Sequence, residues 1–222
     1  MIEQLLPSGV VAVEAFEDMV GEAAFPGEED LVVSVVECRR REFITSRRCA
    51  REALARLGYP PVPIRSGPRR EPQWPTGVVG SITHTMGFRA AAVAPMRVLA
   101  SLGIDAEPNQ PLPGGVEERI TVRGEPKMLT ALSRSFPGTQ WGRLLFSAKE
   151  SVYKAWYPLT GRWLGYEDAS LTIDPAGKFD AKLLVDDIST DGELLLTELH
   201  GRFLVARGLV TTAVAVPNRH AQ

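Results

Sequence analysis

The strongest constraint on the fold is a run of 21 residues, Pro60 to Gly80, that contains six prolines and three glycines. Proline lacks a backbone N–H and fixes φ, so neither a helix nor a central strand continues through such a run. Before it, an S-x-x-E capping box at Ser34 and Glu37 precedes apolar residues at helical spacing, which predicts a long helix that stops before Gly58. The run therefore separates this helix from the strands predicted after it.

The remainder of the chain predicts strands, a second helix and further strands. Short apolar stretches at about 90–94 and 98–105 indicate two strands, and apolar residues at helical spacing indicate a helix from about residue 140 to Tyr157. Strand patterns then follow as LTID, FDAKLL, LTELHGRFLVA and LVTTAVAV, the last two joined by a turn at Arg207 and Gly208.

This order of elements predicts an α+β fold of two similar lobes, each one helix packed on a small, mainly antiparallel sheet. We expect an N-terminal lobe at 1–104, with an arginine-rich helix and a basic loop. We expect a C-terminal lobe at 105–222, with the second helix and the C-terminal strands.

The composition excludes several classes of protein. No apolar run approaches the ~20 residues that span a bilayer, and the N-terminus lacks the positively charged region of a signal peptide, so we expect a cytoplasmic protein. Cys38 and Cys49 have no metal-ligand spacing and are interpreted as plain thiols.

The net charge of −2 hides a strong asymmetry. Residues 1–37 contain nine acidic side chains and no Lys or Arg, whereas residues 38–70 contain ten arginines and two glutamates. Arginine without lysine favours planar recognition of phosphate or carboxylate, and the overall balance argues against a nucleic-acid binder. A small polyanionic ligand fits better. The candidates are Arg40, Arg47 and Arg51, within about 20° of one line along the helix, and Arg65, Arg69 and Arg70 in the loop.

The stretch GIDAEP ends a buried strand in two carboxylates, Asp105 and Glu107. Residues i and i+2 of a strand point to the same side about 7 Å apart, so two like charges are held together. A solvated strand end would explain them. A hard-cation site is the other interpretation, because paired carboxylates repel unless a metal or a proton neutralises them.

The second helix, LLFSAKESVYKAW, places Glu150 and Lys154 at i and i+4, with Lys149 beside them. An exposed ion pair worth ~0.3–0.5 kcal/mol is one interpretation. The other is that Glu150 completes an oxygen shell with the two strand carboxylates. Upstream, GSITH contains His84, which is either hydrogen-bonded scaffolding or a functional group.

Taken together, GSITH, GIDAE and FSAKESVYKAW, in this order and spacing, resemble the 4′-phosphopantetheinyl transferases of the surfactin-synthetase type. The similarity is closest to the branch serving enterobactin-like siderophore synthetases and actinobacterial polyketide and lipid synthases. That branch also carries the arginine-rich RREFITxR helix and the GPxREPxWPxGxxGSxTH loop found here. The resemblance covers residues 38–166.

The resemblance implies a pseudo-twofold fold that binds coenzyme A and Mg²⁺ between its lobes, with Mn²⁺ as the alternative metal. It implies transfer of phosphopantetheine from coenzyme A to a serine of an apo acyl or peptidyl carrier protein, releasing 3′,5′-ADP. The matching metal ligands are Asp105, Glu107 and Glu150, and the catalytic residues are Glu150 as candidate base, Lys154 and His84. The residues matched to coenzyme A binding are Arg40, Arg47, Arg65, Arg69, Arg70, Ser81, His84, Lys149 and Lys154.

Two alternatives stay open at this level: a metal-dependent coenzyme A or nucleotide hydrolase, and a non-catalytic coenzyme A or carrier-binding protein. We expect a monomer that uses neither nucleic acid nor membrane as a partner. Several relatives carry a lysine near Ser66, which leaves open which loop arginine replaces it. The carrier protein and its pathway are not predicted.

Overall fold

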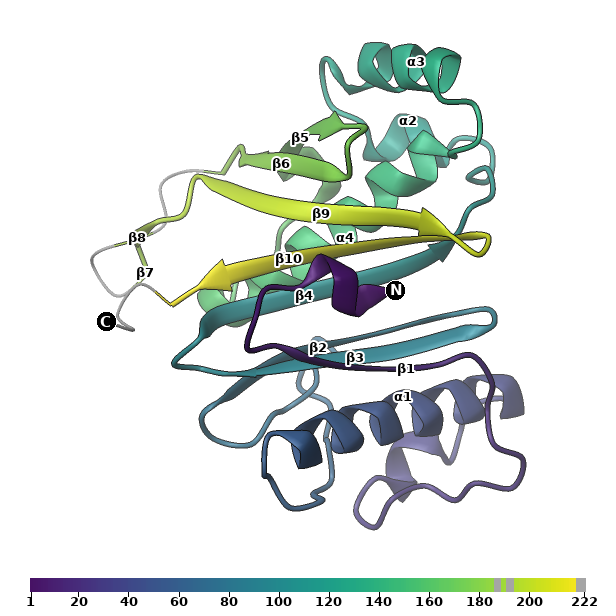
Figure 1. Cartoon of the computed structure of the whole chain (residues 1–222), viewed down its shortest axis with the longest axis vertical. Helices are drawn as coiled ribbons and strands as arrows, with labels where there is room; N and C mark the ends of the chain where they lie inside the picture. The colour runs from purple at the N-terminus through teal and green to yellow at the C-terminus, as the bar shows by residue number, and fades with distance from the viewer. Residues whose placement is uncertain (186–188, 191–193, 219–222) are drawn as a thin grey trace.

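The computed structural model describes residues 1–185, 189–190 and 194–218, and it is an α+β fold in which helices pack on antiparallel sheets (Figure 1). Within the described residues, no helix is both long and apolar enough to span a bilayer. The helices are α1 (Glu37–Arg56), α2 (Val116–Ile120), α3 (Glu125–Ser135) and α4 (Trp141–Thr160), with short 3₁₀ turns η1 (Ile2–Leu5), η2 (Glu29–Val32) and η3 (Tyr166–Asp168). The strands are β1 (Val11–Ala15), β2 (Val78–Thr85), β3 (Phe88–Pro95), β4 (Leu99–Pro108), β5 (Ala169–Asp174), β6 (Lys178–Leu183), β7 (Ser189–Thr190), β8 (Leu194–Leu195), β9 (Glu198–Ala206) and β10 (Leu209–Pro217).

The N-terminal lobe packs α1 on a three-stranded antiparallel sheet in the order β1-β3-β2. Ala50 and Leu54 of α1 are fully buried in one cluster with Val93 of β3. The helix ends in a Schellman arrangement, because Tyr59 N donates to Leu54 O at 3.0 Å and Gly58 adopts a positive φ of 86°. The end before Gly58 is therefore as predicted.

The start of α1 is not as predicted. The helix begins at Glu37 after an N-cap at Val36, with no side-chain hydrogen bond at the cap. The Glu37 carboxylate instead pairs with Arg41 at 2.8 Å. The proposed capping box at Ser34 is wrong because Ser34 precedes the helix by more than one residue.

The acidic N-terminal segment lies against the arginine-rich part of the same lobe. Glu28 is completely buried and accepts hydrogen bonds from Arg51 and from Ile64 N, both at 2.7 Å. The charge asymmetry along the sequence is therefore largely neutralised inside the lobe, and two of the candidate arginines, Arg51 and Arg65, pair with carboxylates of this segment. The ion pairs are Asp18–Arg89, Glu22–Arg48, Glu28–Arg51 and Asp30–Arg65.

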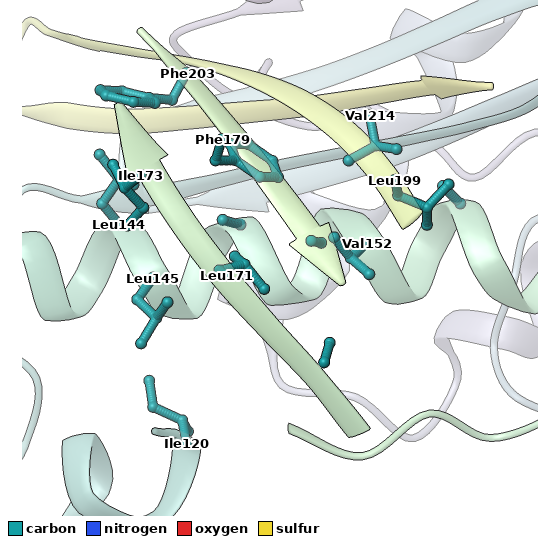
Figure 2. Packing of buried hydrophobic residues seen from close by; sticks show 14 of the residues in the cluster. Ile120, Leu144, Leu145, Val152, Leu171, Ile173, Phe179, Leu199, Phe203 and Val214 are labelled. Atoms are coloured by element: carbon teal, nitrogen blue, oxygen red, sulfur yellow. The ribbon is translucent and has the colours of Figure 1, made fainter. Parts of the chain in front are cut away.

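The C-terminal lobe packs α4 on a five-stranded antiparallel sheet in the order β4-β10-β9-β6-β5. Figure 2 shows Leu144 and Val152 on the side of α4 that faces the strands and Leu145 on the side that faces Ile120 of α2; all three belong to one core with Leu171 and Phe179. The turn at Arg207 and Gly208, both with positive φ, joins β9 to β10 where the sequence places it. The two lobes thus share a helix-on-sheet plan with different numbers of strands.

Three features of this half were not predicted. The polar region before residue 139 contains α2 and α3, and α4 continues through Pro158 to Thr160. Pro158 removes one backbone hydrogen bond of this helix, and only two residues of α4 follow it.

The division that we place between residues 104 and 105 falls inside β4, which is paired with β10 along its length. That division stays a prediction.

Gly103 of β4 sets the distance between this strand and α4. A Cβ atom at this position would lie 2.0 Å from Ser151 O and 2.7 Å from Ala155 N of the helix. The neighbouring Ser101 Oγ donates to Ala155 O at 2.7 Å. Only glycine allows this approach, which brings the residues around Ser151 close to the end of β4.

Candidate active site

A cavity of about 870 Å³ lies between α1, the 66–74 loop, β2 and α4. Apolar side chains such as Phe43, Trp74 and Tyr153 form much of its wall. Seven of the residues predicted from the sequence line it: Arg47, Arg69, Arg70, Ser81, His84, Glu150 and Lys154.

Strands β2 and β4 meet beside this cavity, but in the part of the chain that the structure describes they share no backbone ladder. Hydroxyl groups of β2 replace it, since Ser81 Oγ accepts from Ile104 N and Thr83 Oγ1 accepts from Ala106 N, each at 3.0 Å. The backbone N–H groups on the free edge of β4 are thereby satisfied. Ser81 has this structural task in addition to lining the cavity.

Lys154 reaches from α4 into the junction of these two strands. Its Nζ donates to Asp105 Oδ1 at 2.7 Å and to Ile104 O at 3.0 Å. The exposed ion pair with Glu150, one of the two interpretations from the sequence, is therefore not what the structure shows. The cation of Lys154 is held next to Asp105 at the cavity wall.

The two carboxylate oxygens of Asp105 differ in their hydrogen bonding. Oδ1 accepts from Lys154 and from Thr83 Oγ1 at 3.3 Å, whereas Oδ2 is buried and has no hydrogen-bond partner among the described residues. A buried carboxylate oxygen without a partner is costly, and an ion is one explanation for it. Carboxylate oxygen is also the ligand that Mg²⁺ prefers, so the residues present fit a hard divalent cation.

Glu107, two residues further along β4, shares the same environment. Burial, and then the negative charge of Asp105, raise the pKa of Glu107 above its usual range, while Arg143 opposes the shift. Arg143 NH1 donates to Glu107 Oε2 at 3.0 Å. Unfavourable burial of like charges is the situation that a bound cation relieves.

Glu150, the third predicted ligand, accepts a hydrogen bond at Oε1 from the hydroxyl of Tyr166. Burial, and then the contact with Glu150, raise the pKa of Tyr166, so the hydroxyl remains a donor at neutral pH. Glu150 thus lies on the cavity wall with a fixed partner that the sequence did not predict.

The three carboxylates do not form a compact ligand group by themselves. Among the described residues, the one set of three or more possible ligands within 4.8 Å of one another is Asp180, Glu198 and His200, which are all exposed. Lys154, Arg143 and Tyr166 each hold a different member of the predicted set. The assignment of Asp105, Glu107 and Glu150 as metal ligands stays a prediction that the orphaned oxygen of Asp105 supports.

Arg47 is the cation best placed for an anionic ligand. It is only 7% exposed, and its guanidinium lies 3.5 Å from the centre of the Phe43 ring and donates to Ile64 O and Ser66 Oγ, both at 2.9 Å. No carboxylate among the described residues forms an ion pair with it. Burial lowers its pKa to about 10, which still leaves it protonated at neutral pH.

His84 lies on β2 next to a second arginine that the sequence analysis did not select. Arg39 NH1 is 2.9 Å from His84 Nδ1, and Glu42 Oε2 is 3.4 Å from the same nitrogen. Burial, followed by the charges of Arg39 and Lys154, lowers the pKa of His84 to about 3. A neutral imidazole at this position offers hydrogen bonds to a ligand rather than a positive charge.

Three predicted coenzyme A residues lie away from the cavity. Arg40 lies on the face of α1 that contacts the N-terminal segment, and its NH1 is 3.9 Å from Glu37 Oε2. Arg65 pairs with Asp30 and donates to Gly27 O at 2.6 Å. Lys149 is buried, with its Nζ bonded to Ile120 O, Glu125 Oε2 and Tyr166 O at 2.7, 3.0 and 2.8 Å. The expectation that Lys149 lies beside Glu150 and Lys154 on a polar face needs correction, because the adjacent residues Lys149 and Glu150 point about 100° apart on the helix.

Some residues of the site that the sequence analysis did not select do follow a recognisable sequence pattern. Arg39, Phe43 and Arg47 recur every four residues and share the face of α1 that lines the cavity. Thr83 follows Ser81 by two residues, so strand alternation places both hydroxyls on one side. No local pattern indicates Tyr166, because its contact with Glu150 arises only in the folded chain.

Comparison with known protein families gives two matches that cover most of the chain. Residues 27–94 match the 4′-phosphopantetheinyl transferase N-terminal domain, and residues 101–208 match the 4′-phosphopantetheinyl transferase superfamily. The two matches meet at the turn between β3 and β4.

Individual relatives agree with these matches. The chain is 50% identical to 4′-phosphopantetheinyl transferase Svp of Streptomyces mobaraensis, over 97% of this chain and 89% of the relative. It is 46% identical to 4′-phosphopantetheinyl transferase Npt of Nocardia iowensis, over 97% of this chain and 99% of the relative. It is 37% identical to enterobactin synthase component D of Salmonella typhi, over 53% of this chain and 48% of the relative.

An apolar-walled cavity lined by cations and a carboxylate suits a ligand that carries phosphate groups, and the matched relatives are named as transferases of such a group. The chain belongs to the 4′-phosphopantetheinyl transferase superfamily, in the branch that the sequence motifs indicated.

Proposed function

We propose that this chain transfers 4′-phosphopantetheine from coenzyme A to a serine hydroxyl of an apo carrier protein, assisted by a divalent cation. The observation that carries the proposal is the cavity in which Lys154, Glu150 and Arg47 converge, with the orphaned oxygen of Asp105 beside it. The names of relatives that are 43–50% identical over 97% of the chain support the same reaction.

In this reaction the carrier serine oxygen forms a bond to the pantetheine-side phosphorus of the coenzyme A pyrophosphate. The bond from that phosphorus to the bridging oxygen breaks, 3′,5′-ADP leaves, and the serine proton passes to a base. The protein supplies mostly positioning and charge stabilisation for such a transfer. Glu150 is the candidate base because its carboxylate lines the cavity.

The basic residues divide between binding and charge stabilisation. Arg47, buried beside Phe43, would bind the 3′-phosphate end of coenzyme A, with Arg69 and Arg70 at the same side of the cavity. Lys154 would place a positive charge next to the transferred phosphate. His84, being neutral, would donate or accept a hydrogen bond at the pyrophosphate.

Asp105, Glu107 and Glu150 would hold a cation, Mg²⁺ or Mn²⁺, with room left for phosphate oxygens and water. When bound, the cation would offset negative charge on the pyrophosphate as the bond breaks. We expect the protein to act as a monomer.

Charge removal at two of these residues tests the site. Asp105→Asn and Glu150→Gln should each reduce the transfer rate at least a hundredfold at a fixed Mg²⁺ concentration, with little change in melting temperature. Asp180→Asn is the matched control, because Asp180 is an exposed carboxylate of β6 that is bonded to His200 of β9 and does not line the cavity. Transfer by a folded Asp105→Asn protein at the rate of the Asp180→Asn protein would disprove the assignment. Release of 3′,5′-ADP without a carrier protein would indicate a hydrolase instead.

A further inference from the structure

Tyr166 lies outside the sequence motifs, yet its hydroxyl donates a hydrogen bond to Glu150 Oε1. We propose that Tyr166 is a positioning residue, which holds the Glu150 carboxylate so that its second oxygen can serve as a ligand to a divalent cation. This inference rests on the proposed function. It also gives Lys149, the neighbour of Glu150, a role different from coenzyme A binding.

Tyr166 itself is fixed from several sides. Its ring stacks on Phe146 of α4, with ring centres 5.7 Å apart and planes at 29°. Its backbone oxygen accepts a hydrogen bond from Lys149 Nζ at 2.8 Å. The η3 turn that contains it is closed by a bond from Gly165 N to Asp168 Oδ2 at 2.8 Å. The phenol therefore presents its hydroxyl from one defined direction.

The anchor for this arrangement is a buried ion pair. Lys149 and Glu125 lie 3.0 Å apart, and their side chains are 2% and 1% exposed. Glu125 also accepts from Val122 N at 2.7 Å and from Leu171 N at 2.8 Å. The ion pair ties α4 to α3, and the two backbone bonds tie Glu125 to the segment before α3 and to β5. The ion pair is therefore well satisfied despite its burial.

Lys149 and Glu150 are consecutive, and Tyr166 connects them. Lys149 Nζ donates to the backbone oxygen of Tyr166, and the Tyr166 hydroxyl donates to the Glu150 carboxylate. On α4 the two side chains point in different directions, Lys149 into the interior and Glu150 to the cavity wall. The buried Lys149–Glu125 pair thus sets the position of the Tyr166 hydroxyl, which donates a hydrogen bond to Glu150.

Fixing Glu150 matters because a glutamate side chain has several rotatable bonds, and ordering it costs free energy. A hydrogen bond already present before the cation binds reduces that cost. It also occupies Oε1, while Oε2 has no protein partner among the residues that the structure describes. Loss of comparable outer partners at metal sites typically lowers metal affinity or activity about 10- to 100-fold.

The test is Tyr166→Phe, which removes the hydroxyl and keeps both the ring stack and the backbone bond to Lys149. The readout is Mn²⁺ binding to the coenzyme A-saturated protein, measured by the loss of the free Mn²⁺ signal in electron paramagnetic resonance. We expect the dissociation constant for Mn²⁺ to rise about tenfold or more. The Mg²⁺ concentration for half-maximal transfer should rise by the same factor. Tyr59→Phe, at the end of α1, is the matched control for the loss of a tyrosine hydroxyl and should change neither value.

A double-mutant cycle separates positioning from general damage to the fold. In a Glu150→Ala background, Tyr166→Phe should have no further effect on Mn²⁺ binding, because the residue through which it acts is gone. Wild-type affinity in Tyr166→Phe, or an equal loss in both backgrounds, would overturn the proposal. A wild-type protein that binds Mn²⁺ but transfers nothing would refute the proposed function, while the same Mn²⁺ comparison would still decide the role of Tyr166.

Discussion

Replacement of Gly103 by alanine tests whether close packing of α4 on β4 positions the site. The added Cβ would lie 2.0 Å from Ser151 O, whereas ordinary contact begins at 3.4 Å. The obstacle is the backbone of a 20-residue helix, so rotation of one side chain cannot relieve the clash. The helix or the strand has to move by more than about 1 Å.

The expected stability cost is about 3 kcal/mol, at the upper end of the usual range for overpacking because backbone atoms collide. In a chain of this size that corresponds to a fall in melting temperature of roughly 6–12 °C. Glu150 and Lys154 flank Ser151 in sequence and would move with it. A displacement of ~1 Å commonly costs about a hundredfold in rate.

The assay combines urea unfolding with the rate of phosphopantetheine transfer to a carrier protein. Gly114→Ala is the matched control, since Gly114 is exposed and a Cβ there meets nothing within 4 Å. The control should stay within ~0.5 kcal/mol of the wild type. Gly103→Ala with the stability and rate of the control would refute the close packing and its effect on the site.

Three further predictions concern thiols, a histidine and an arginine. Cys38 is exposed, whereas burial of Cys49 raises its pKa to about 11, so a disulfide reagent should label one thiol rapidly, and Cys38→Ser should abolish that phase. The pKa of His84 is about 3 in the folded chain and ~6.5 when unfolded, so its contribution to stability is complete above pH 6.5 and is lost as the pH falls toward 3. His84→Gln should therefore flatten the acid side of the stability curve, and parallel curves would contradict this. Arg47→Ala should weaken use of coenzyme A strongly and use of 3′-dephospho-coenzyme A little, whereas equal losses would exclude a contact with the 3′-phosphate.

Local patterns were sufficient for the parts of the fold that depend on periodicity and chain breakers. The end of α1 at Gly58, the core of α4 and the β9–β10 turn follow directly from apolar spacing and from glycine. The start of α1 was not predicted correctly from these patterns, because Glu37 forms ion pairs with arginines one turn later instead of capping the helix. Short helices such as α2 and α3 carry too few residues to show a clear period.

Partners across the fold explain the rest of the site. Strand alternation was enough to pair Asp105 with Glu107, but the actual partner of Lys154 is Asp105, because α4 crosses the β2–β4 junction. The sequence analysis selected Arg40, whereas Arg39, one position earlier, lines the cavity, and one position on a helix is a rotation of about 100°. The pairing of the acidic segment with arginines likewise depends on where the connection between β1 and α1 lies, and its only regular element is the short turn η2.

The most direct test of the transfer reaction is the intact mass of a panel of apo carrier proteins after incubation with this protein, coenzyme A and Mg²⁺. We expect at least one carrier to gain the mass of a single phosphopantetheine group, with one equivalent of 3′,5′-ADP released per modified carrier. The gain should disappear when the carrier serine is replaced by alanine. An unchanged mass for every carrier in the panel, under conditions where a known transferase modifies them, would contradict the proposed function.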